Sequence, residues 1–368
     1  MTRRFVQLRV DGRWLMSEVL LILANGGPGG MQRVVSTLAL GLRSKGVDVA
    51  VAVGGDLPVH GLGPGSGVPL LRLPAFSGRT GGSSFARALR KLVRRERPVV
   101  LHGHGLRLAP LLRLCGRGVV VRLVTCHGLD PTTLSSVVRP LRLAHIRVAA
   151  CGEGPLQLLH EAGVDVFLLP VGIGSAPLPL SRSSLAESFA FDPGRPIVAA
   201  ALRLTPQKDP ATMIRAVAAL PDVQLVICGD GPLERDVLRL VDELHASGRV
   251  RLAGYRSDAR AILGASDAVL LSSVWEGHVL VGLEAMSAGV PLVATACPGI
   301  KEWTEDGVNI LLAPVGDSGA LGRQLEKALT DQSLRLRLIS GGAEVAARHT
   351  IDTMVASHLD AYGISPGG

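Results

Sequence analysis

Apolar runs of strand length alternate with helical patterns along nearly the whole chain, and this alternation constrains the fold more than any other feature. Clear strand-like runs occupy residues 19–23, 47–53, 99–102 and 119–124. Two parallel strands need a crossover between them, which is usually a helix, so a regular alternation predicts parallel doubly wound sheets. We therefore expect an α/β fold.

The alternation is interrupted once, by a polar segment rich in proline and serine at residues 175–195, and a new strand-helix series begins at Pro196. With 368 residues and 47% hydrophobic content, the chain is long enough for two α/β domains. We predict Rossmann-like domains over residues 16–174 and 196–341, joined by a linker at 175–195. Residues 1–15 are interpreted as an N-terminal extension, and residues 342–368 as a C-terminal helix.

The cysteines and the apolar runs bear on the compartment. The five cysteines are scattered and form no CxxC pair, which argues against a disulfide framework or a structural zinc site and favours a reducing cytoplasm. No run approaches the roughly 20 apolar residues that a membrane span requires. The apolar run at 15–24 is broken by Ser17 and Glu18 and lacks a cleavage site for a signal peptide. We expect a cytoplasmic protein, either a monomer or a homodimer.

Charge is distributed unevenly along the chain. Residues 1–190 contain 23 Lys and Arg against 10 Asp and Glu, whereas the remainder contains 16 against 21. A basic half can meet an anionic acceptor, a lipid headgroup surface or nucleic acid. Aromatic residues make up only 3% of the chain and no nucleic-acid motif is present, so we expect no nucleic-acid partner. Two interpretations of the basic half stay open: it makes weak peripheral contact with an anionic membrane, or it is simply a solvated surface.

Two glutamates, Glu276 and Glu284, stand eight positions apart across a turn. On one continuous helix they would lie about 80° and about 12 Å apart, too far for one ligand. However, residues 267–273 resemble a buried parallel strand and 280–288 a helix. Glu276 would then lie on the loop and Glu284 inside the helix, where both can face one crevice.

This stretch resembles the E-x7-E signature of the retaining glycosyltransferases of family 4, which have the GT-B architecture of two facing Rossmann-like domains with a cleft between them. Other stretches that resemble the family follow in the expected order, at residues 26–30, 125–128, 171–173, 203–209, 228–232 and 298–302. The resemblance covers about residues 18–361. It implies a nucleoside diphosphate sugar as donor, with a UDP-sugar favoured, and a C-terminal helix that crosses back onto the N-terminal domain.

The resemblance also implies which residues act. Arg203 and Lys208 lie where a strand ends, at the sheet edge where α/β proteins bind ligands, and would neutralise the diphosphate without a metal or any other cofactor. Glu284 would accept hydrogen bonds from the ribose hydroxyls, because an ionised carboxylate is an acceptor only. Glu276 would act at the donor hexose. The predicted catalytic residues are His127, Glu276, Arg203 and Lys208. The predicted donor-binding residues are Gly29, Gly30, Arg203, Lys208, Gly277, His278, Val279, Leu280, Glu284 and Glu302.

The histidines leave questions open. His102, His104 and His127 fall at strand ends on one domain edge, but no carboxylate or cysteine completes a metal-ligand set, so we predict no metal site. The resemblance places His127 near the donor sugar, either as a proton shuttle or as a group that positions hydroxyls. His278 either hydrogen-bonds donor hydroxyls or caps its loop. Val279 replaces the small residue common in the family.

We therefore expect a metal-independent retaining glycosyltransferase. Two acceptor classes stay open: a cell-envelope or lipid-linked saccharide, which suits the basic half, and a natural-product aglycone or aminocyclitol. The alternative function is a catalytically silent GT-B protein that binds a nucleotide sugar or serves as a scaffold.

Overall fold

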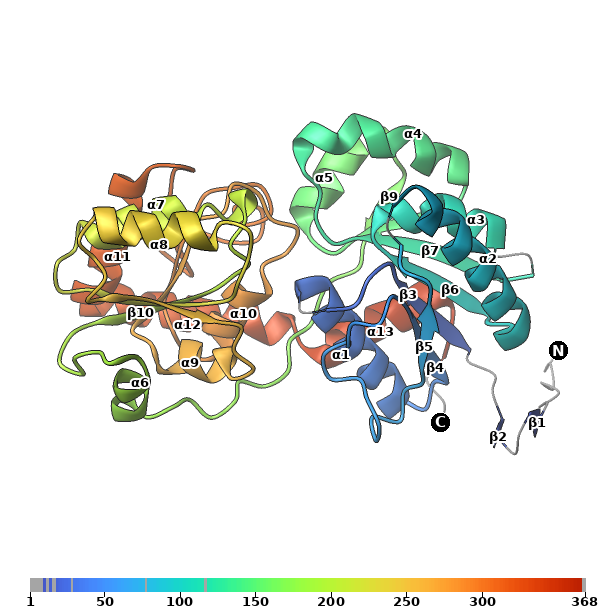
Figure 1. Ribbon diagram of the computed structural model, residues 1–368, viewed down its shortest axis with the longest axis horizontal. Helices are drawn as coiled ribbons and strands as arrows, with labels where there is room; N and C mark the ends of the chain where they lie inside the picture. Colours follow the sequence, from blue (N-terminus) through green and yellow to red (C-terminus); the bar gives the residue numbers. More distant parts are fainter. Residues whose placement is uncertain are drawn as a thin grey trace. The chain divides into compact units, whose positions relative to one another are not determined.

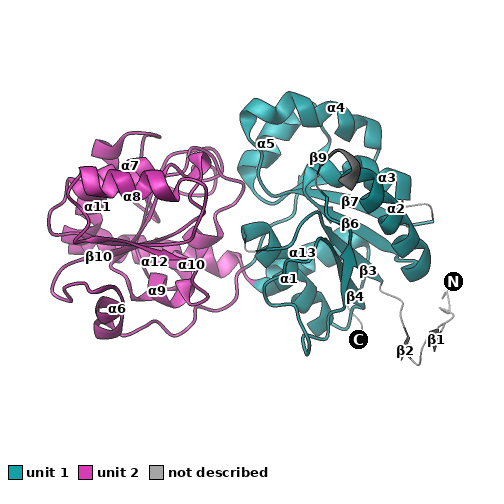
Figure 2. Ribbon diagram, in the orientation of Figure 1, with its two compact units in different colours: residues 1–172, 351–368 teal, residues 173–350 magenta. Residues whose placement is uncertain are grey.

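A computed structural model of the protein describes residues 9–10, 13–14, 18–27, 29–76, 78–115 and 118–365 (Figure 1). The chain forms two compact units, coloured teal and magenta in Figure 2. Unit 1 comprises residues 1–172 and 351–368, and unit 2 comprises residues 173–350. In the predicted N-terminal extension, β1 (Arg9–Val10) and β2 (Arg13–Trp14) pair in antiparallel fashion, and the rest of residues 1–15 lies outside the described residues.

Unit 1 is built on a parallel sheet whose seven described strands have the order β5-β4-β3-β6-β7-β8-β9. The strands are β3 (Val19–Leu23), β4 (Val49–Gly54), β5 (Leu70–Leu73), β6 (Val100–His104), β7 (Val121–Cys126), β8 (Arg147–Ala150) and β9 (Val166–Leu168). The helices are α1 (Gly30–Ser44), α2 (Gly78–Glu96), α3 (Ala109–Cys115), α4 (Leu134–Ala144), α5 (Glu153–Glu161) and α13 (Ile351–Tyr362), with short 3₁₀ helices η1 (Leu106–Leu108) and η2 (Pro131–Thr133).

The sheet of unit 1 is covered on both faces. Every residue of β3 is buried, as a central strand of a doubly wound sheet requires. Leu20 and Ile22 of this strand join a core cluster with Phe85 and Leu89 of α2 and Leu112 of α3. Helix α1 packs against α13, the last helix of the chain (Figure 1).

Unit 2 is built on a second parallel sheet, whose six described strands have the order β12-β11-β10-β13-β14-β15. The strands are β10 (Ile197–Ala201), β11 (Gln224–Cys228), β12 (Val250–Gly254), β13 (Ala268–Leu271), β14 (Leu292–Thr295) and β15 (Leu311–Ala313). The helices are α6 (Arg182–Phe189), α7 (Pro210–Ala218), α8 (Glu234–Glu243), α9 (Ala259–Ala265), α10 (Leu280–Ser287), α11 (Ser318–Thr330) and α12 (Gln332–Arg348), with a 3₁₀ helix η3 (Pro206–Lys208). The α/β fold with two doubly wound parallel sheets, predicted from the alternation, is confirmed.

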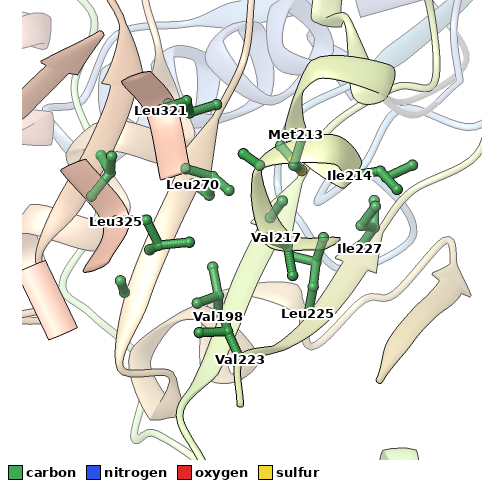
Figure 3. Close-up of a cluster of buried hydrophobic side chains, with 14 of the residues drawn as sticks. Val198, Met213, Ile214, Val217, Val223, Leu225, Ile227, Leu270, Leu321 and Leu325 are labelled. Atoms are coloured by element: carbon green, nitrogen blue, oxygen red, sulfur yellow. The ribbon is translucent and has the colours of Figure 1, made fainter. Parts of the chain in front are cut away.

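The core of unit 2 lies between its sheet and helices α7 and α11 (Figure 3). Val198, Leu225 and Leu270 project from three neighbouring strands and meet Met213 of α7 and Leu325 of α11, all of them buried. Burial of such side chains contributes about 1.5–3 kcal/mol each relative to exposure.

Both sheets reverse their winding direction at the first strand, and this places the candidate site. In unit 2 the chain runs from β10 to β11 and β12 on one side and then returns to β13, β14 and β15 on the other. The loops that follow β10 and β13 therefore diverge from neighbouring strands at the carboxyl edge, where open α/β sheets bind ligands. In unit 1 the equivalent strands are β3 and β6.

Two boundaries differ from those predicted. The predicted linker at 175–195 contains helix α6 and belongs to unit 2, because Ser181 caps the helix and Arg182 pairs with Asp267 at 2.5 Å. The predicted C-terminal helix at 342–368 comprises the end of α12 and the whole of α13, which belong to different units. His349 and Thr350 separate the two helices, and the amide of Ile173 donates to the carbonyl of His349.

Replacing Leu270 by alanine should lower the free energy of unfolding of unit 2 by about 2–5 kcal/mol, because a buried leucine leaves a cavity that the sheet cannot fill. Urea unfolding followed by circular dichroism would measure this. The control is Leu238→Ala, at a side chain that is 47% exposed, which should change stability by less than about 0.5 kcal/mol. Equal effects of the two substitutions would contradict the assigned core.

Candidate active site

The loops after β10 and β13 are bonded to each other by their backbones. The amide of Val274 donates to the carbonyl of Gln207 at 2.8 Å, and the Gln207 side chain donates to the carbonyl of Trp275 at 2.9 Å. The Ser272 hydroxyl lies 2.8 Å from the carbonyl of Lys208. These bonds fix one loop against the other, so residues far apart in sequence hold a constant geometry at the carboxyl edge.

A buried ion pair lies between these two loops. The Lys208 ammonium donates to Glu276 Oε1, and the Ser273 hydroxyl donates to the same oxygen at 2.5 Å. Glu276 is only 6% exposed, and burying a carboxylate is costly unless such partners hydrogen-bond to it. The structure thus brings together two of the predicted catalytic residues, whereas the contribution of Ser273 was missed because a serine at a strand end carries no distinctive pattern.

The loop after β14 supports Glu276 from behind. The amide of Glu276 donates to the carbonyl of Pro298 at 2.8 Å. Gly299 has a φ of +91°, and a Cβ at this position would collide with the Glu276 carbonyl, so only glycine allows the close approach. Glu302 Oε2 accepts from the Gly299 amide at 2.7 Å. One oxygen of Glu302, a predicted donor-binding residue, is therefore engaged in shaping this turn.

Arg203 projects into solvent at the same edge. Its neighbours Leu202 and Leu204 are buried. Their amides donate to the carbonyls of Cys228, the last residue of β11, and Asp230 in the loop that follows. Because side chains alternate along an extended backbone, Arg203 must point outward. Its exposed guanidinium and the Lys208 ammonium are the cations that the loop after β10 places at the switch point.

Glu284 lies inside α10 and is 4% exposed. Its Oε1 lies 3.2 Å from Nε of Arg260, the second residue of α9. The Arg260 guanidinium also donates to the carbonyls of Gly174 and Ser175, both at 2.8 Å. Sequence reasoning did not find Arg260, because it lies outside every stretch that resembles the family. The ion pair with Arg260 fixes the orientation of the Glu284 carboxylate within α10.

His278 is packed as an aromatic ring. It stacks on Trp303 at 5.1 Å and on His349 at 5.3 Å between ring centroids. Burial, reinforced by His349, lowers the pKa of His278 to about 3, so the ring is neutral at physiological pH. Neither ring nitrogen has a hydrogen-bond partner among the described residues. The loop-capping alternative is therefore wrong, whereas hydrogen bonding of His278 to donor hydroxyls stays a prediction.

The other predicted residues of unit 2 lead into α10. Gly277 is buried, Val279 occupies the position before the first helical turn, and Leu280 begins the helix. No side chain among the described residues caps this helix start. The amides of its first turn can thus donate hydrogen bonds to an anionic group.

In unit 1, the predicted residues lie at the carboxyl edge of its own sheet. Gly29 and Gly30 are exposed at the start of α1. His127 follows β7, and its Nε2 lies 2.8 Å from Nδ1 of His104 at the end of β6. No group of three or more His, Cys, Asp or Glu side chains in the described part of the chain is arranged to hold a metal ion.

The basic excess of the N-terminal half is concentrated on three adjacent helices. Helices α2, α3 and α4 pack in a row. Their exposed basic residues, which we call the basic layer, are Arg87, Arg90, Lys91, Arg94, Arg95, Arg113, Arg139 and Arg142. The acidic residue in the described parts of these helices is Glu96, which is buried and accepts from Arg95 at 2.7 Å.

A shallow pocket lined mainly by apolar atoms of α4, including Leu134, Val138 and Leu143, adjoins this layer. No described helix is long and apolar enough to cross a membrane.

Lys208→Met should lower the free energy of unfolding by about 2 kcal/mol, because it leaves the buried Glu276 carboxylate without its cation. The exposed Arg203→Met should change it by less than about 0.5 kcal/mol. Adding Glu276→Gln to Lys208→Met should recover most of the loss, since no unpaired charge then remains. Thermal unfolding of the wild type and these three variants measures this, and a loss that the second substitution does not reduce would contradict the pairing.

Two family models match the chain. Residues 181–345 match the family model described as glycosyl transferases group 1, and residues 28–152 match that of glycosyltransferase family 4. The structure of Anabaena HepE in complex with UDP and glucose superimposes with a TM-score of 0.83 at 20% identity, over 94% of this chain and 99% of that one.

Curated relatives match shorter stretches. The lipopolysaccharide core biosynthesis glycosyltransferase LpsE of Rhizobium meliloti is 38% identical over 149 residues, 40% of this chain and 44% of the relative. The D-inositol 3-phosphate glycosyltransferase of Mycolicibacterium smegmatis is 32% identical over 212 residues, 55% of this chain and 47% of the relative. The chain thus spans about half the length of the curated relatives it matches.

Proposed function

Because this chain belongs to the family 4 glycosyltransferases of group 1, we propose that it transfers a sugar from a nucleoside diphosphate sugar to an acceptor hydroxyl. The observation that carries the proposal is the Lys208–Glu276 pair at the switch point of unit 2, with the exposed Arg203 on the same loop. Fold alone would not require a buried carboxylate at this position, since a well-packed apolar side chain costs less.

The diphosphate would bind the two cations. Lys208 has three N–H donors, and one of them is engaged by Glu276, so two remain for phosphate oxygens. Arg203 can bind an anion with two parallel hydrogen bonds. Breaking the anomeric C–O bond leaves negative charge on the nucleoside diphosphate, and each positioned cation stabilises that charge by about 3 kcal/mol. The open start of α10 would add its amides.

The two glutamates would recognise hydroxyl groups. Glu276 would accept from the donor hexose, because Lys208 and Ser273 hold its Oε1 and leave Oε2 for a ligand. Glu284, oriented by Arg260, would accept from the ribose. Gly277 between strand and helix allows the sugar to approach the backbone closely.

We further propose that the donor is a UDP-sugar, that transfer needs no metal, and that it proceeds with retention. The similarity to a protein crystallised with UDP supports the base. The two cations on the loop after β10 supply the charge that a divalent metal would otherwise provide, which supports metal independence. Retention rests on the resemblance to the family, in which the acceptor attacks from the side of the leaving group.

Titration of UDP-, GDP- and ADP-sugars by calorimetry, with and without EDTA, tests the donor site. We expect one UDP-sugar to bind equally well with EDTA. Lys208→Ala and Glu284→Ala should each weaken its binding by tenfold or more, the value of one or more charged hydrogen bonds.

Matched controls lie on α11, where Lys327→Ala and Glu326→Ala remove the same charges from exposed positions and should leave binding unchanged. Failure of every donor to bind, or equal losses in the controls, would overturn the donor site. Tight binding of a donor with neither hydrolysis nor transfer would favour the catalytically silent alternative.

The basic layer favours an acceptor at the cell envelope. A lipid-linked or envelope saccharide lies at an anionic surface, which attracts exposed arginines, whereas a soluble aglycone would leave the basic layer without a role. The relative named for lipopolysaccharide core biosynthesis supports this choice. We propose that α2 contacts anionic headgroups weakly and brings unit 1 to its acceptor. The cytoplasmic location expected from the cysteines stays a prediction.

Co-sedimentation with phosphatidylglycerol vesicles tests this contact. The wild type should bind weakly at low salt and release as salt rises, because screening shortens the range of surface charges. Reversing Arg87, Lys91 and Arg94 to glutamate should reduce binding by about a hundredfold or more, because each basic residue near the surface contributes about 1 kcal/mol. The same reversal at the exposed Arg215, Arg323 and Lys327 of unit 2 should have little effect. Similar losses in both variants, or no binding by the wild type, would contradict the proposal.

A further inference from the structure

His104 and His127 form a hydrogen-bonded pair of imidazoles at the carboxyl edge of unit 1. His104 Nδ1 and His127 Nε2 lie 2.8 Å apart, and the ring centroids 5.1 Å. His104 is 1% exposed, whereas His127 is partly exposed. The other nitrogen of His104, Nε2, is buried and has no hydrogen-bond partner among the described residues. This asymmetry between the two nitrogens of His104 determines where its proton can be.

The surroundings keep both rings neutral. His102 stacks on His104 at 4.1 Å, and α13 contributes His358 and Tyr362 to the same cluster. Burial, followed by the nearby imidazoles, lowers the pKa of His104 well below its ordinary value, and burial with His358 lowers that of His127 to about 3. Burial raises the pKa of Tyr362, which stays protonated. Neither shift includes a contribution from a carboxylate, whose negative charge would favour an imidazolium.

A neutral imidazole carries one proton, and the short contact between the rings needs one proton between its two nitrogens. If His127 donated from Nε2, His104 would keep its proton on Nε2 as a buried N–H without a partner. If His104 donates from Nδ1, its Nε2 is a bare lone pair. Buried N–H groups without a partner are rarer in proteins than unpaired acceptors, which favours the second arrangement.

We propose that His104 is a positioning residue that fixes the tautomer of His127: His104 Nδ1–H donates to His127 Nε2, and His127 therefore holds its own proton on Nδ1. His127 presents an N–H donor on the side of the ring away from His104. Its Nε2 lone pair is already engaged, so the ring has no free site at which to accept a proton.

For the transferase, the consequence is that His127 positions a ligand oxygen and does not act as a general base. This step rests on the proposed function, since it needs a sugar hydroxyl or a phosphate oxygen as the acceptor of the Nδ1–H hydrogen bond. The tautomer itself is a property of the free protein. It can therefore be tested without substrate.

Nuclear magnetic resonance of the protein labelled with ¹⁵N-histidine is the test. In the free wild type we expect His127 to show a protonated Nδ1 and a bare Nε2, unchanged between about pH 5 and about pH 8, where an ordinary histidine titrates. A proton on His127 Nε2, or titration of His127 in this range, would overturn the proposal. Because no donor is present, this outcome is independent of whether the protein transfers sugar.

Two substitutions separate positioning from packing. His104→Asn keeps a short N–H donor and should preserve the His127 tautomer. His104→Phe keeps a ring but removes the donor, so His127 should lose its fixed tautomer and kcat/KM should fall about tenfold, the value of one hydrogen bond. The effect of His104→Phe should be visible in the spectrum at unchanged melting temperature. If both substitutions leave the tautomer intact, His104 does not position His127, whereas a changed tautomer with no donor binding in any variant would count against the proposed function alone.

Discussion

The carboxylate of Glu276, buried at the edge of a parallel sheet, is the constraint on which the candidate site depends. At 6% exposure it cannot rely on water, so it needs Lys208 and Ser273 within hydrogen-bond distance. These partners follow β10 and β13, which are neighbours in the sheet although about 70 residues separate them in sequence. Because β10 and β13 are parallel neighbours, the loops that follow them lie at the same edge of the sheet, and the charge pair therefore depends on this strand order.

Local patterns were sufficient to predict the architecture because each element is specified by its own residues. The apolar runs of β3 and β13 are buried along their whole length, and α10 begins at the predicted residue. The boundary between the units, in contrast, depends on contacts between residues that lie far apart in sequence. Composition suggested a linker at 175–195, but Arg182 bonds to Asp267, 85 residues away, and this pairing ties α6 to unit 2. Likewise, the break between α12 and α13 depends on the hydrogen bond from Ile173 to His349.

The candidate site was predictable only where the residue itself carries the signal. Glu276 follows one buried strand and Lys208 follows another, and a charged residue at the end of a buried strand is easily recognised in a sequence. The structure places both at the carboxyl edge of the sheet of unit 2. Arg260 and Ser273 are common residue types in ordinary positions, and what gives them a role is the side chain opposite, which no sequence pattern specifies. The distribution of charge was predictable to a similar extent. The sequence assigned the basic excess to one half of the chain, but it could not show that the basic residues gather on α2, α3 and α4.

The two partly exposed histidines of the predicted site differ in what constrains them. His278 is held by stacking between Trp303 and His349, which fixes the plane of the ring but leaves both nitrogens without a protein partner. His127 is held by a hydrogen bond at Nε2, which fixes the proton as well as the plane. A ring constrained only by packing can present either nitrogen to a ligand as donor or acceptor. Of the two, His127 alone has its hydrogen-bonding polarity set by the protein before any ligand arrives, and that polarity depends on a buried side chain with no access to the substrate.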